Sequence, residues 1–422
     1  MFLQRLGSAL VIAAFLLLFL LPSFCRADWN VYTIQPLNHF ISWYSVRSLA
    51  LDDQGCAHLA YGSDSLYYAH SLTGEGYPAW LVENLSTAAG VDGDEVSDGK
   101  ASGFAALALD AADNPHLCYY AHGCLIYTRR KGIAWITKTI DDSHHVGTSI
   151  SIVLGPEGSA HISFYDCQQK CLKYVFIRES KAGSGPEPGS AGEPDPEIIP
   201  EIIDDSADVG MVNSLSLDSA GNVHLAYYDW SHRDLKYACK RGSRWEIQVV
   251  DSFGDVGDWP ALAVDQDGHP HLSYCDWTNR NLKYARHTGE GWNLETVDAS
   301  DDDTGRCTAI ALDREGRPQI SYFNLSRHRL MYAAHDGRTW QTRVVSEDED
   351  IEGSTALAID SSGQSHIIYY NYTTGSLKYA LFRKDSRLSQ SSESSDWPIA
   401  GGKNAPAAVD VGCFLSVIKT LW

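Results

Sequence analysis

Short segments that alternate between apolar and polar residues run through the chain, separated by turn residues. The clearest copy reads Ser214-Leu-Ser-Leu-Asp218, then Gly221–Asp229, then Leu235-Lys-Tyr-Ala238, and then Trp245. Alternation with a period of two and enrichment in Tyr, Val, Ile and Leu are typical of β-strands. The Asp-x-x-Gly step after the first segment is typical of a hairpin turn capped by Asp. The pattern therefore predicts four short strands, called a, b, c and d below.

The same phrase occurs seven times. An a–b turn residue is followed six positions later by a His, or once by a Gln. The turn residues are Asp52, Asp110, Gly155, Asp218, Asp265, Asp313 and Asp360. The residues that follow are His58, His116, His161, His224, His271, Gln319 and His366. The last three intervals between turn residues are 47, 48 and 47 residues, and such a period is typical of propeller blades.

The fourth strand of the last copy is missing from its expected place. Strand d begins at a Trp in most copies, but no such strand follows the seventh Leu-Lys-Tyr-Ala phrase. A matching segment, Trp29–Ile34, stands near the start of the chain. In the third copy, a Gly-, Pro- and Ser-rich loop at 181–197 precedes a strand d expected at Ile198–Ile203. We therefore predict an all-β, seven-bladed β-propeller of four-stranded blades, closed by its N-terminal strand, which removes open sheet edges.

The repeats divide the chain into three parts. Residues 1–27 carry Arg5 and then the apolar run Ala9–Leu21, which is too short to span a bilayer and is typical of a signal peptide. Residues 28–382 form the predicted propeller, and residues 383–422 are a Ser-rich linker with a short apolar tail. We expect a secreted protein, extracellular or periplasmic, with no stable membrane span.

The charge of the chain narrows the choice of partners. Asp and Glu total 54 against 33 Lys and Arg, which gives a net charge of −21. Such a chain repels nucleic acid and anionic membrane surfaces. It suits cations, basic proteins or neutral ligands such as glycans, although acidity also keeps an exported protein soluble.

The loops that share one face of a propeller, b–c and d–a, are here acidic and aromatic. The motif Asp208-Val-Gly210 recurs as Asp255-Val-Gly257, and two b–c loops begin with Asp-Trp. Tryptophans on this face could stack on sugar rings, and a ring of carboxylates could hold calcium. The alternative is that each Asp after strand b caps its own turn. The candidate ligand-binding residues are Asp208, Asp229, Trp230, Asp255, Trp259, Asp276, Trp277 and Asp303.

Neither the repeated histidines nor any known catalytic motif gives a reason to assign a metal site or a catalytic residue. Each His belongs to a different blade, so we expect the seven positions to be spread around a ring and to bond locally rather than hold a metal. The sequence has no nucleophile elbow, zinc-protease motif or phosphate-binding Gly loop. We assign no catalytic residue and no cofactor, with calcium the one ion considered.

The cysteines predict disulfides in an oxidising compartment. Cys118 and Cys124 straddle one b–c hairpin, and Cys167 and Cys171 straddle the next. Cys275 ends a strand b and Cys307 begins the following strand a. We expect the bonds Cys118–Cys124, Cys167–Cys171 and Cys275–Cys307.

The segment Asp336-Gly-Arg-Thr-Trp340 is similar to the end of an Asp-box, and Gly289-Glu-Gly-Trp292 is a fainter version. With the repeat spacing over about residues 28–382, these segments resemble the BNR or Asp-box repeats of bacterial secreted propellers related to the sialidase superfamily. The resemblance implies a propeller fold. Sialidases place an arginine triad, a Tyr nucleophile and a Glu in the central pocket; here Arg47 and Arg306 fall near strand a, and no third Arg matches.

The leading hypothesis is a secreted, non-catalytic, monomeric propeller that binds a glycan or an extracellular protein on its acidic and aromatic loop face. The alternative is a carbohydrate-active enzyme of the sialidase-like class, a glycosidase or lyase, that uses the central pocket. A purely structural or surface-display module is a third possibility.

Overall fold

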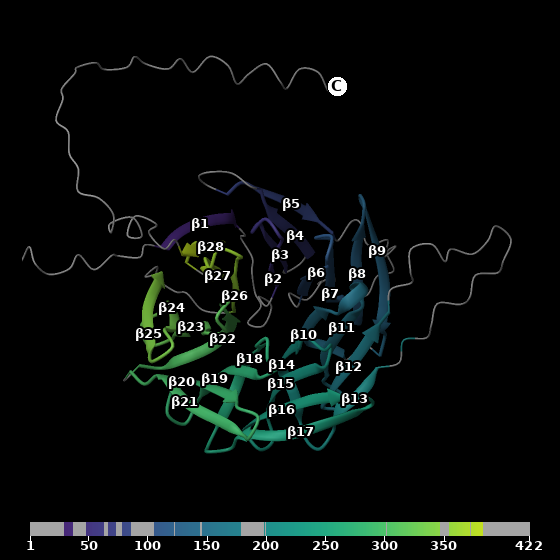
Figure 1. Ribbon diagram of the computed structural model, residues 1–422. Helices are drawn as coiled ribbons and strands as arrows, with labels where there is room; N and C mark the ends of the chain where they lie inside the picture. The colour runs from purple at the N-terminus through teal and green to yellow at the C-terminus, as the bar shows by residue number, and fades with distance from the viewer. Residues whose placement is uncertain are drawn as a thin grey trace, which may run out of the picture. The chain divides into compact units, whose positions relative to one another are not determined.

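Each sequence repeat folds into one four-stranded antiparallel sheet, and the seven sheets are arranged as a β-propeller (Figure 1). The computed structural model describes residues 29–36, 48–62, 66–72, 78–85, 105–121, 123–143, 146–178, 198, 200–300, 302–346, 354–371 and 373–382. The chain divides into the units Met1–Lys384 and Asp385–Trp422, and every described residue belongs to the first. The predicted signal peptide, the 181–197 loop and the C-terminal tail lie outside these ranges.

Blades 1 to 3 take their strands in chain order, a to d. Their strands are β2 (Leu49–Leu51), β3 (Ala57–Gly62), β4 (Leu66–Ser71) and β5 (Trp80–Asn84); β6 (Ala105–Leu109), β7 (Pro115–Ala121), β8 (Cys124–Lys131) and β9 (Ala134–Asp141); and β10 (Val146–Leu154), β11 (Ala160–Asp166), β12 (Cys171–Ile177) and β13 (Glu201–Asp204). Strand β13 is shorter than the expected Ile198–Ile203. Ile198 packs instead against the core cluster between blades 2 and 3.

Blades 4 to 7 follow the same order until the last strand. Their strands are β14 (Val209–Leu217), β15 (Val223–Asp229), β16 (Asp234–Arg241) and β17 (Arg244–Asp251); β18 (Val256–Val264), β19 (Pro270–Asp276), β20 (Asn281–His287) and β21 (Trp292–Asp298); β22 (Thr304–Leu312), β23 (Pro318–Asn324), β24 (Arg329–His335) and β25 (Trp340–Ser346); and β26 (Thr355–Ile359), β27 (Ser365–Asn371) and β28 (Ser376–Phe382). One short 3-10 helix, η1 (Pro156–Gly158), forms an a–b turn. The part of the chain that is described holds no helix long and apolar enough to cross a membrane.

The N-terminal strand β1 (Trp29–Pro36) completes blade 7, as the missing strand d predicts. It pairs antiparallel with β28, with Trp29 opposite Phe382, and the sheet order is β1-β28-β27-β26. Figure 1 shows β1 beside β28, although the two strands lie at opposite ends of the described sequence. The prediction of a ring closed by the N-terminal strand is therefore confirmed.

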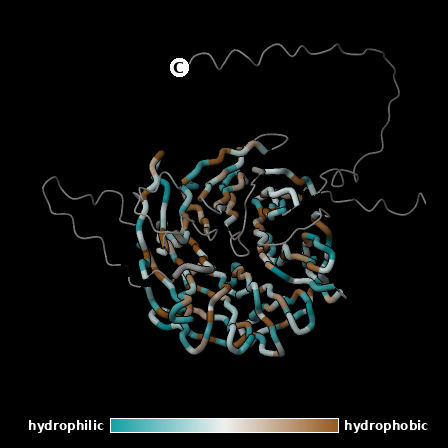
Figure 2. The backbone as a smooth tube through the Cα atoms, turned by 180° about the vertical axis from the view of Figure 1, so that it is seen from behind, coloured by the Kyte–Doolittle hydropathy of each residue, from teal (hydrophilic) through white to brown (hydrophobic). Residues whose placement is uncertain are grey.

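The hydrophobic core consists of layers between neighbouring blades. Along the strands apolar and polar residues alternate, as the brown and teal segments of Figure 2 show. Each of the seven buried clusters joins the facing sheets of two adjacent blades; one of them packs Leu225 and Tyr227 of blade 4 against Leu172 and Tyr174 of blade 3. Because a lone blade cannot bury its two faces, each blade depends on both neighbours for its core.

A Trp–Tyr contact repeats across six of the seven blade interfaces. The strand d Trp of one blade packs edge-on against the strand c Tyr of the preceding blade, as Trp245 does on Tyr174 with ring centroids 5.3 Å apart. The equivalent pairs are Trp29–Tyr332, Trp80–Tyr379, Trp135–Tyr68, Trp292–Tyr237 and Trp340–Tyr284. The interface without this pair is that of blades 2 and 3, because blade 3 lacks the Trp.

The repeated His bonds to the same strand c Tyr. In six blades His Nδ1 lies 2.5 to 2.7 Å from the Tyr hydroxyl, as in His224–Tyr237, and in blade 6 the Tyr332 hydroxyl donates to Gln319 instead. The Asp of the a–b turn accepts two backbone N–H groups through Oδ1 and directs Oδ2 to the other His nitrogen, as Asp265 does to His271 at 3.2 Å. The expectation of local bonding for the histidines is met in these contacts.

The repeated Asp-x-Gly step of the d–a loops is explained by close packing. Gly210, Gly257 and Gly305 have φ values of +91°, +100° and +88°. A Cβ atom on Gly257 would lie 2.5 Å from Cα of Leu235 in the preceding blade. A positive φ and this close approach both require glycine. The glycine of the motif therefore fixes how strand a enters the ring.

We predict that Gly257→Ala lowers the free energy of unfolding by about 3 kcal/mol, because the new Cβ meets backbone atoms that cannot move away. Gly242→Ala is the matched control: Gly242 also has a positive φ, of +63°, but a Cβ there meets nothing within 4 Å. The control should lose about 1 kcal/mol. Equal losses in urea denaturation would show that the close approach to Leu235 is unimportant.

Acid should destabilise the propeller through His161, whose turn residue is Gly155 rather than Asp. Burial, with a smaller effect of the Lys240 charge, lowers the pKa of His161 to about 4. The unfolded chain binds a proton near pH 6.5, so stability is complete above that pH and falls as the pH drops towards 4. One proton corresponds to about 1.4 kcal/mol per pH unit.

His161→Gln should reduce this loss on acidification while changing stability at pH 8 little, because Gln319 shows that Gln can accept the Tyr bond. Urea denaturation between pH 8 and about pH 4.5 measures both effects. A variant with the pH dependence of the parent protein would show that His161 does not carry the effect.

Candidate ligand-binding site

The b–c and d–a loops are joined to one another on one face of the ring, called the loop face below. Backbone bonds connect the d–a loops that lead into blades 4, 5 and 6 to the b–c loops of the same blade and of the preceding blade. Trp277 N donates to the carbonyl of Asp255, and Val256 N donates to the carbonyl of Arg233. All eight candidate ligand-binding residues belong to these loops or to the strand ends beside them.

Two of the candidates, Asp229 and Asp276, are buried turn caps. Asp229 is 1 % and Asp276 2 % exposed. Their Oδ1 atoms accept the backbone N–H groups of His232 and Asn279. Turn capping, the alternative weighed from the sequence, is what these two carboxylates do in the structure.

A buried lysine joins these turns to the neighbouring blade. Lys236 lies 3.2 Å from Asp229 and donates to Asp204, the last residue of strand d in blade 3, over 2.8 Å. The Tyr227 hydroxyl also donates to Asp204. Burial alone would raise the pKa of Asp204, but these hydrogen bonds and those from Ser206 outweigh it and hold the pKa at about 2.

Asp208 and Asp255 are held by tyrosines of the preceding blade. The Tyr165 hydroxyl donates to Asp208 Oδ1 over 2.6 Å, and the Tyr228 hydroxyl donates to Asp255 Oδ1 over 2.7 Å. Trp230 is 53 % exposed and packs edge-on against Tyr228. These three candidates lie on blades 3 to 5 and are linked: the Trp230 N–H donates to the Asp208 carbonyl, and Tyr228, against which Trp230 packs, donates to Asp255.

The other three candidates, Trp259, Trp277 and Asp303, are brought together on blades 5 and 6. The rings of Trp259 and Trp277 lie 5.4 Å apart. The guanidinium of Arg306 lies 4.1 Å from the centroid of Trp277, and its Nη2 donates to Asp303 Oδ2 over 2.9 Å. A cation over an indole face at this distance is a favourable cation–π contact.

Asp258 fixes the orientation of the two indoles. Its Oδ2 accepts the Trp277 Nε1–H over 3.0 Å, and its Oδ1 accepts the backbone N–H of Trp259. Trp259 has a φ of +47°, a conformation that costs a bulky residue energy. The sequence pattern did not point to Asp258, and it pointed to Arg306 only through the comparison with a sialidase triad.

Three polar atoms of this cluster are buried without a hydrogen-bond partner within the described ranges: Trp259 Nε1, Asp303 Oδ1 and Arg306 Nε. The reason at Asp303 is a substitution in the repeat. Where Tyr165 and Tyr228 donate to the equivalent aspartates, blade 5 has Cys275, which cannot reach in the same way. Buried polar groups are costly when unpaired, so a ligand or an ordered water that satisfied these atoms would be stabilised.

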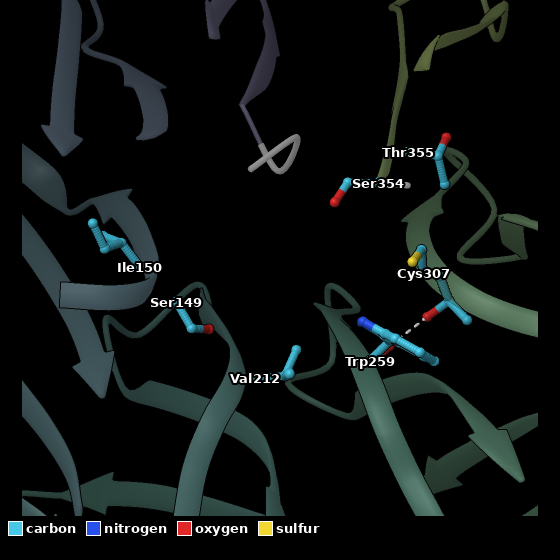
Figure 3. Close-up of a pocket in the computed structure, with 8 residues that line it drawn as sticks. Ser149, Ile150, Val212, Trp259, Cys307, Ser354 and Thr355 are labelled. Atoms are coloured by element: carbon cyan, nitrogen blue, oxygen red, sulfur yellow. Dashed lines mark hydrogen bonds between the residues drawn. The ribbon is translucent and has the colours of Figure 1, made fainter. Parts of the chain in front are cut away.

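Two hollows lie beside the cluster. A cleft of about 680 Å³ is lined by Trp277, Arg280, Asp303, Arg306, Leu325, Ser326 and His328. A cavity of about 20 Å³ lies between the inner strands, and the Trp259 indole nitrogen points into it (Figure 3). The cleft falls in the size range of small-molecule sites, whereas the cavity has room for about one water.

The inner cavity is lined by the residue that follows the Gly-x step of strand a in successive blades. Ser149, Val212, Trp259 and Cys307 occupy this position on β10, β14, β18 and β22, and Ser354 and Thr355 contribute from blade 7 (Figure 3). Ser149 and Cys307 share the positive φ of Trp259, at +69° and +51°. In these three blades the pairing of strands a and b shifts register at this place, as at a β-bulge.

The candidate cation ligands do not meet on the loop face. The aspartates there are engaged by Tyr, Lys, Arg or backbone donors, as described above. Among the residues with described positions, Asp265, Asp267 and His269 are close enough to share an ion, but they lie at an a–b turn, away from the b–c and d–a loops. Calcium binding on the loop face stays a prediction.

The predicted disulfides are not formed in the structure, where the described cysteines are thiols. The register places Cys118 opposite Tyr127 and Cys124 opposite Ala121, three residues away along the strands. Three residues span about 10 Å, beyond the roughly 4.4–6.8 Å that a disulfide needs, so the pairing of Cys118 with Cys124 does not fit. Cys167 is exposed and Cys171 buried, and Cys275 and Cys307 are both buried at the interface of blades 5 and 6; their pairings stay predictions.

Comparison with known proteins shows the fold and no family. No protein-family profile matches the chain, and no curated protein matches it. An ulvan lyase, a polysaccharide lyase, is similar in structure with a TM-score of 0.54 at 12 % identity, covering 87 % of this chain and 99 % of that chain. The same kind of enzyme bound to a GlcA–Rha3S unit gives 0.52 at 11 % identity, covering 84 % and 100 %.

The lectin of Aleuria aurantia is also similar, with a TM-score of 0.44 at 12 % identity, covering 67 % of this chain and 92 % of that chain. At these identities the likeness concerns the propeller fold alone. The resemblance to sialidase-related repeats and a bacterial origin stay predictions. Asp336 does form the turn expected of an Asp-box, since its Oδ1 accepts the N–H groups of Arg338 and Thr339.

Proposed function

We propose that this protein is a secreted, non-catalytic propeller that binds a glycan in the cleft on blades 5 and 6. The observation that carries the proposal is the Trp277–Arg306–Trp259 stack at the edge of that cleft. Arg306 covers one face of the Trp277 indole, which Asp258 holds in place, and the other face is the flat apolar surface that a sugar ring would stack on. Asp303 and Ser326 supply polar groups beside it for sugar hydroxyls.

Binding at the cleft is favoured over chemistry at the ring centre. The inner cavity has a volume of about 20 Å³, and the described residues that line it are Ser, Thr, Val, Ile, Cys and Trp rather than an acid pair. The propeller fold is shared with polysaccharide lyases, but that likeness concerns the fold. A carbohydrate-active enzyme that works in the central pocket or at the cleft is therefore the alternative.

Trp277→Ala should weaken glycan binding at least about tenfold, because a stacked aromatic contributes on the order of 1.4 kcal/mol or more. Trp230→Ala is the matched control: Trp230 follows an Asp at the same b–c position in blade 4 but contacts neither Arg306 nor Trp259 in the described structure. Binding is measured by calorimetry with glycans first identified on an array. Loss of binding in Trp230→Ala with retention in Trp277→Ala would move the site to blade 4.

Catalysis is tested on the same glycans. The proposal expects no new reducing ends and no unsaturated sugar ends after prolonged incubation with pure protein. Turnover that is abolished by Asp303→Asn and retained in Asp255→Asn would establish the enzyme alternative at the cleft.

A further inference from the structure

A basic residue recurs at one strained position of the loop face. The last residue before strand c is Lys170, Arg233, Arg280 and His328 in blades 3 to 6, with φ values of +57°, +63°, +59° and +51°. Blades 2 and 7 have glycine at this place, Gly123 and Gly375, also with positive φ. Glycine is the residue that this conformation favours, so four successive basic residues there have a cost that their side chains must offset.

In blades 3 and 4 the basic residue pairs with the aspartate of the next d–a loop. Lys170 Nζ lies 3.3 Å from Asp208, and Arg233 Nη1 lies 3.4 Å from Asp255. Backbone hydrogen bonds join the same two loops, because the carbonyls of Lys170 and Arg233 accept the N–H groups of Val209 and Val256. In these two blades each charge is neutralised within the protein.

In blade 5 the backbone contact is kept and the ion pair is replaced. The Arg280 carbonyl accepts the Thr304 N–H over 3.0 Å, as in the other blades. The equivalent aspartate, Asp303, is instead paired with Arg306 at 2.9 Å. The Arg280 guanidinium is exposed, lines the cleft and has no carboxylate within salt-bridge distance among the residues described. Arg306 thus takes the place of Arg280 as the partner of the aspartate, and Arg280 lines the cleft.

The lining of the cleft is therefore more basic than acidic. Arg280, Arg306 and His328 line it together with the single carboxylate of Asp303. Asp303 balances Arg306 within this lining, so Arg280 is the arginine left without a carboxylate partner among the described residues. Arginine presents parallel N–H donors that match the oxygens of carboxylates and sulfates.

We propose that the cleft selects an acidic sugar, whose carboxylate or sulfate pairs with Arg280 while its ring stacks on Trp277. This inference rests on the proposed glycan binding at the same cleft and deepens it. It replaces the neutral glycan expected from the overall charge with an anionic one.

The test compares Arg280→Gln with Arg233→Gln, which removes the same side chain from the same backbone conformation where an aspartate already neutralises it. Calorimetry measures the affinities of galacturonic acid oligosaccharides, their carboxyl-reduced neutral forms, and sulfated and unsulfated dextran oligosaccharides. We expect at least one acidic ligand to bind the parent protein about tenfold more tightly than its neutral form, since a charge-assisted pair contributes about 1.5 kcal/mol or more. Arg280→Gln should abolish this preference, and Arg233→Gln should retain it.

The outcomes separate this inference from the proposed function. A preference for galacturonic acid identifies a carboxylate, and a preference for dextran sulfate identifies a sulfate. Binding of neutral and acidic forms with equal affinity, lost in Trp277→Ala, would overturn the acidic-sugar inference and keep glycan binding. Equal losses in Arg280→Gln and Arg233→Gln would also overturn it, since the charge would then act nonspecifically. No binding to any of these ligands or to an array would overturn both.

Discussion

The contact between a strand d Trp and a strand c Tyr of the preceding blade is the interaction on which the ring depends. The Tyr ring receives the indole edge on one side, and its hydroxyl bonds to the His or Gln of its own blade, as in Trp245, Tyr174 and His161. Such a pair contributes about 0.5–1.5 kcal/mol beyond the area it buries. Because Trp29 of β1 makes the same contact with Tyr332, β1 and the last blade close one continuous ring.

Most of this framework could be predicted from the sequence, because a repeat shows each position seven times. The spacing of turn Asp, His and Trp gave the blade, its four strands and the closing strand. The sequence did not predict the details that depend on how strands and blades pair. These are the Tyr partner of each His, the Leu235 backbone that excludes a side chain at Gly257, and the register that separates Cys118 from Cys124. A contact between two strands or two blades leaves no local sequence pattern in either partner.

The candidate site was harder to predict because it is built from departures from the repeat. The composition of the loops pointed to Trp259, Trp277 and Asp303 but equally to five residues that the structure holds in turns or in contacts between neighbouring loops and blades. What distinguishes blades 5 and 6 is Cys275 where two other blades have a donating Tyr, and Arg306 where the equivalent residues are Met211 and Asp258. These substitutions free Asp303 Oδ1 and turn Arg280 from an internal partner into a lining residue of the cleft. A repeat fold can thus acquire one distinct site by altering a single interface while the other interfaces maintain the ring.

The most direct test of the account is a crystal structure of the protein with an acidic oligosaccharide bound. The account predicts one sugar ring over the face of Trp277, its anionic group against the Arg280 guanidinium, and no sugar in the inner cavity beside Trp259. An oligosaccharide bound at the ring centre, or on blades 3 and 4 against Trp230 and Arg233, would contradict it.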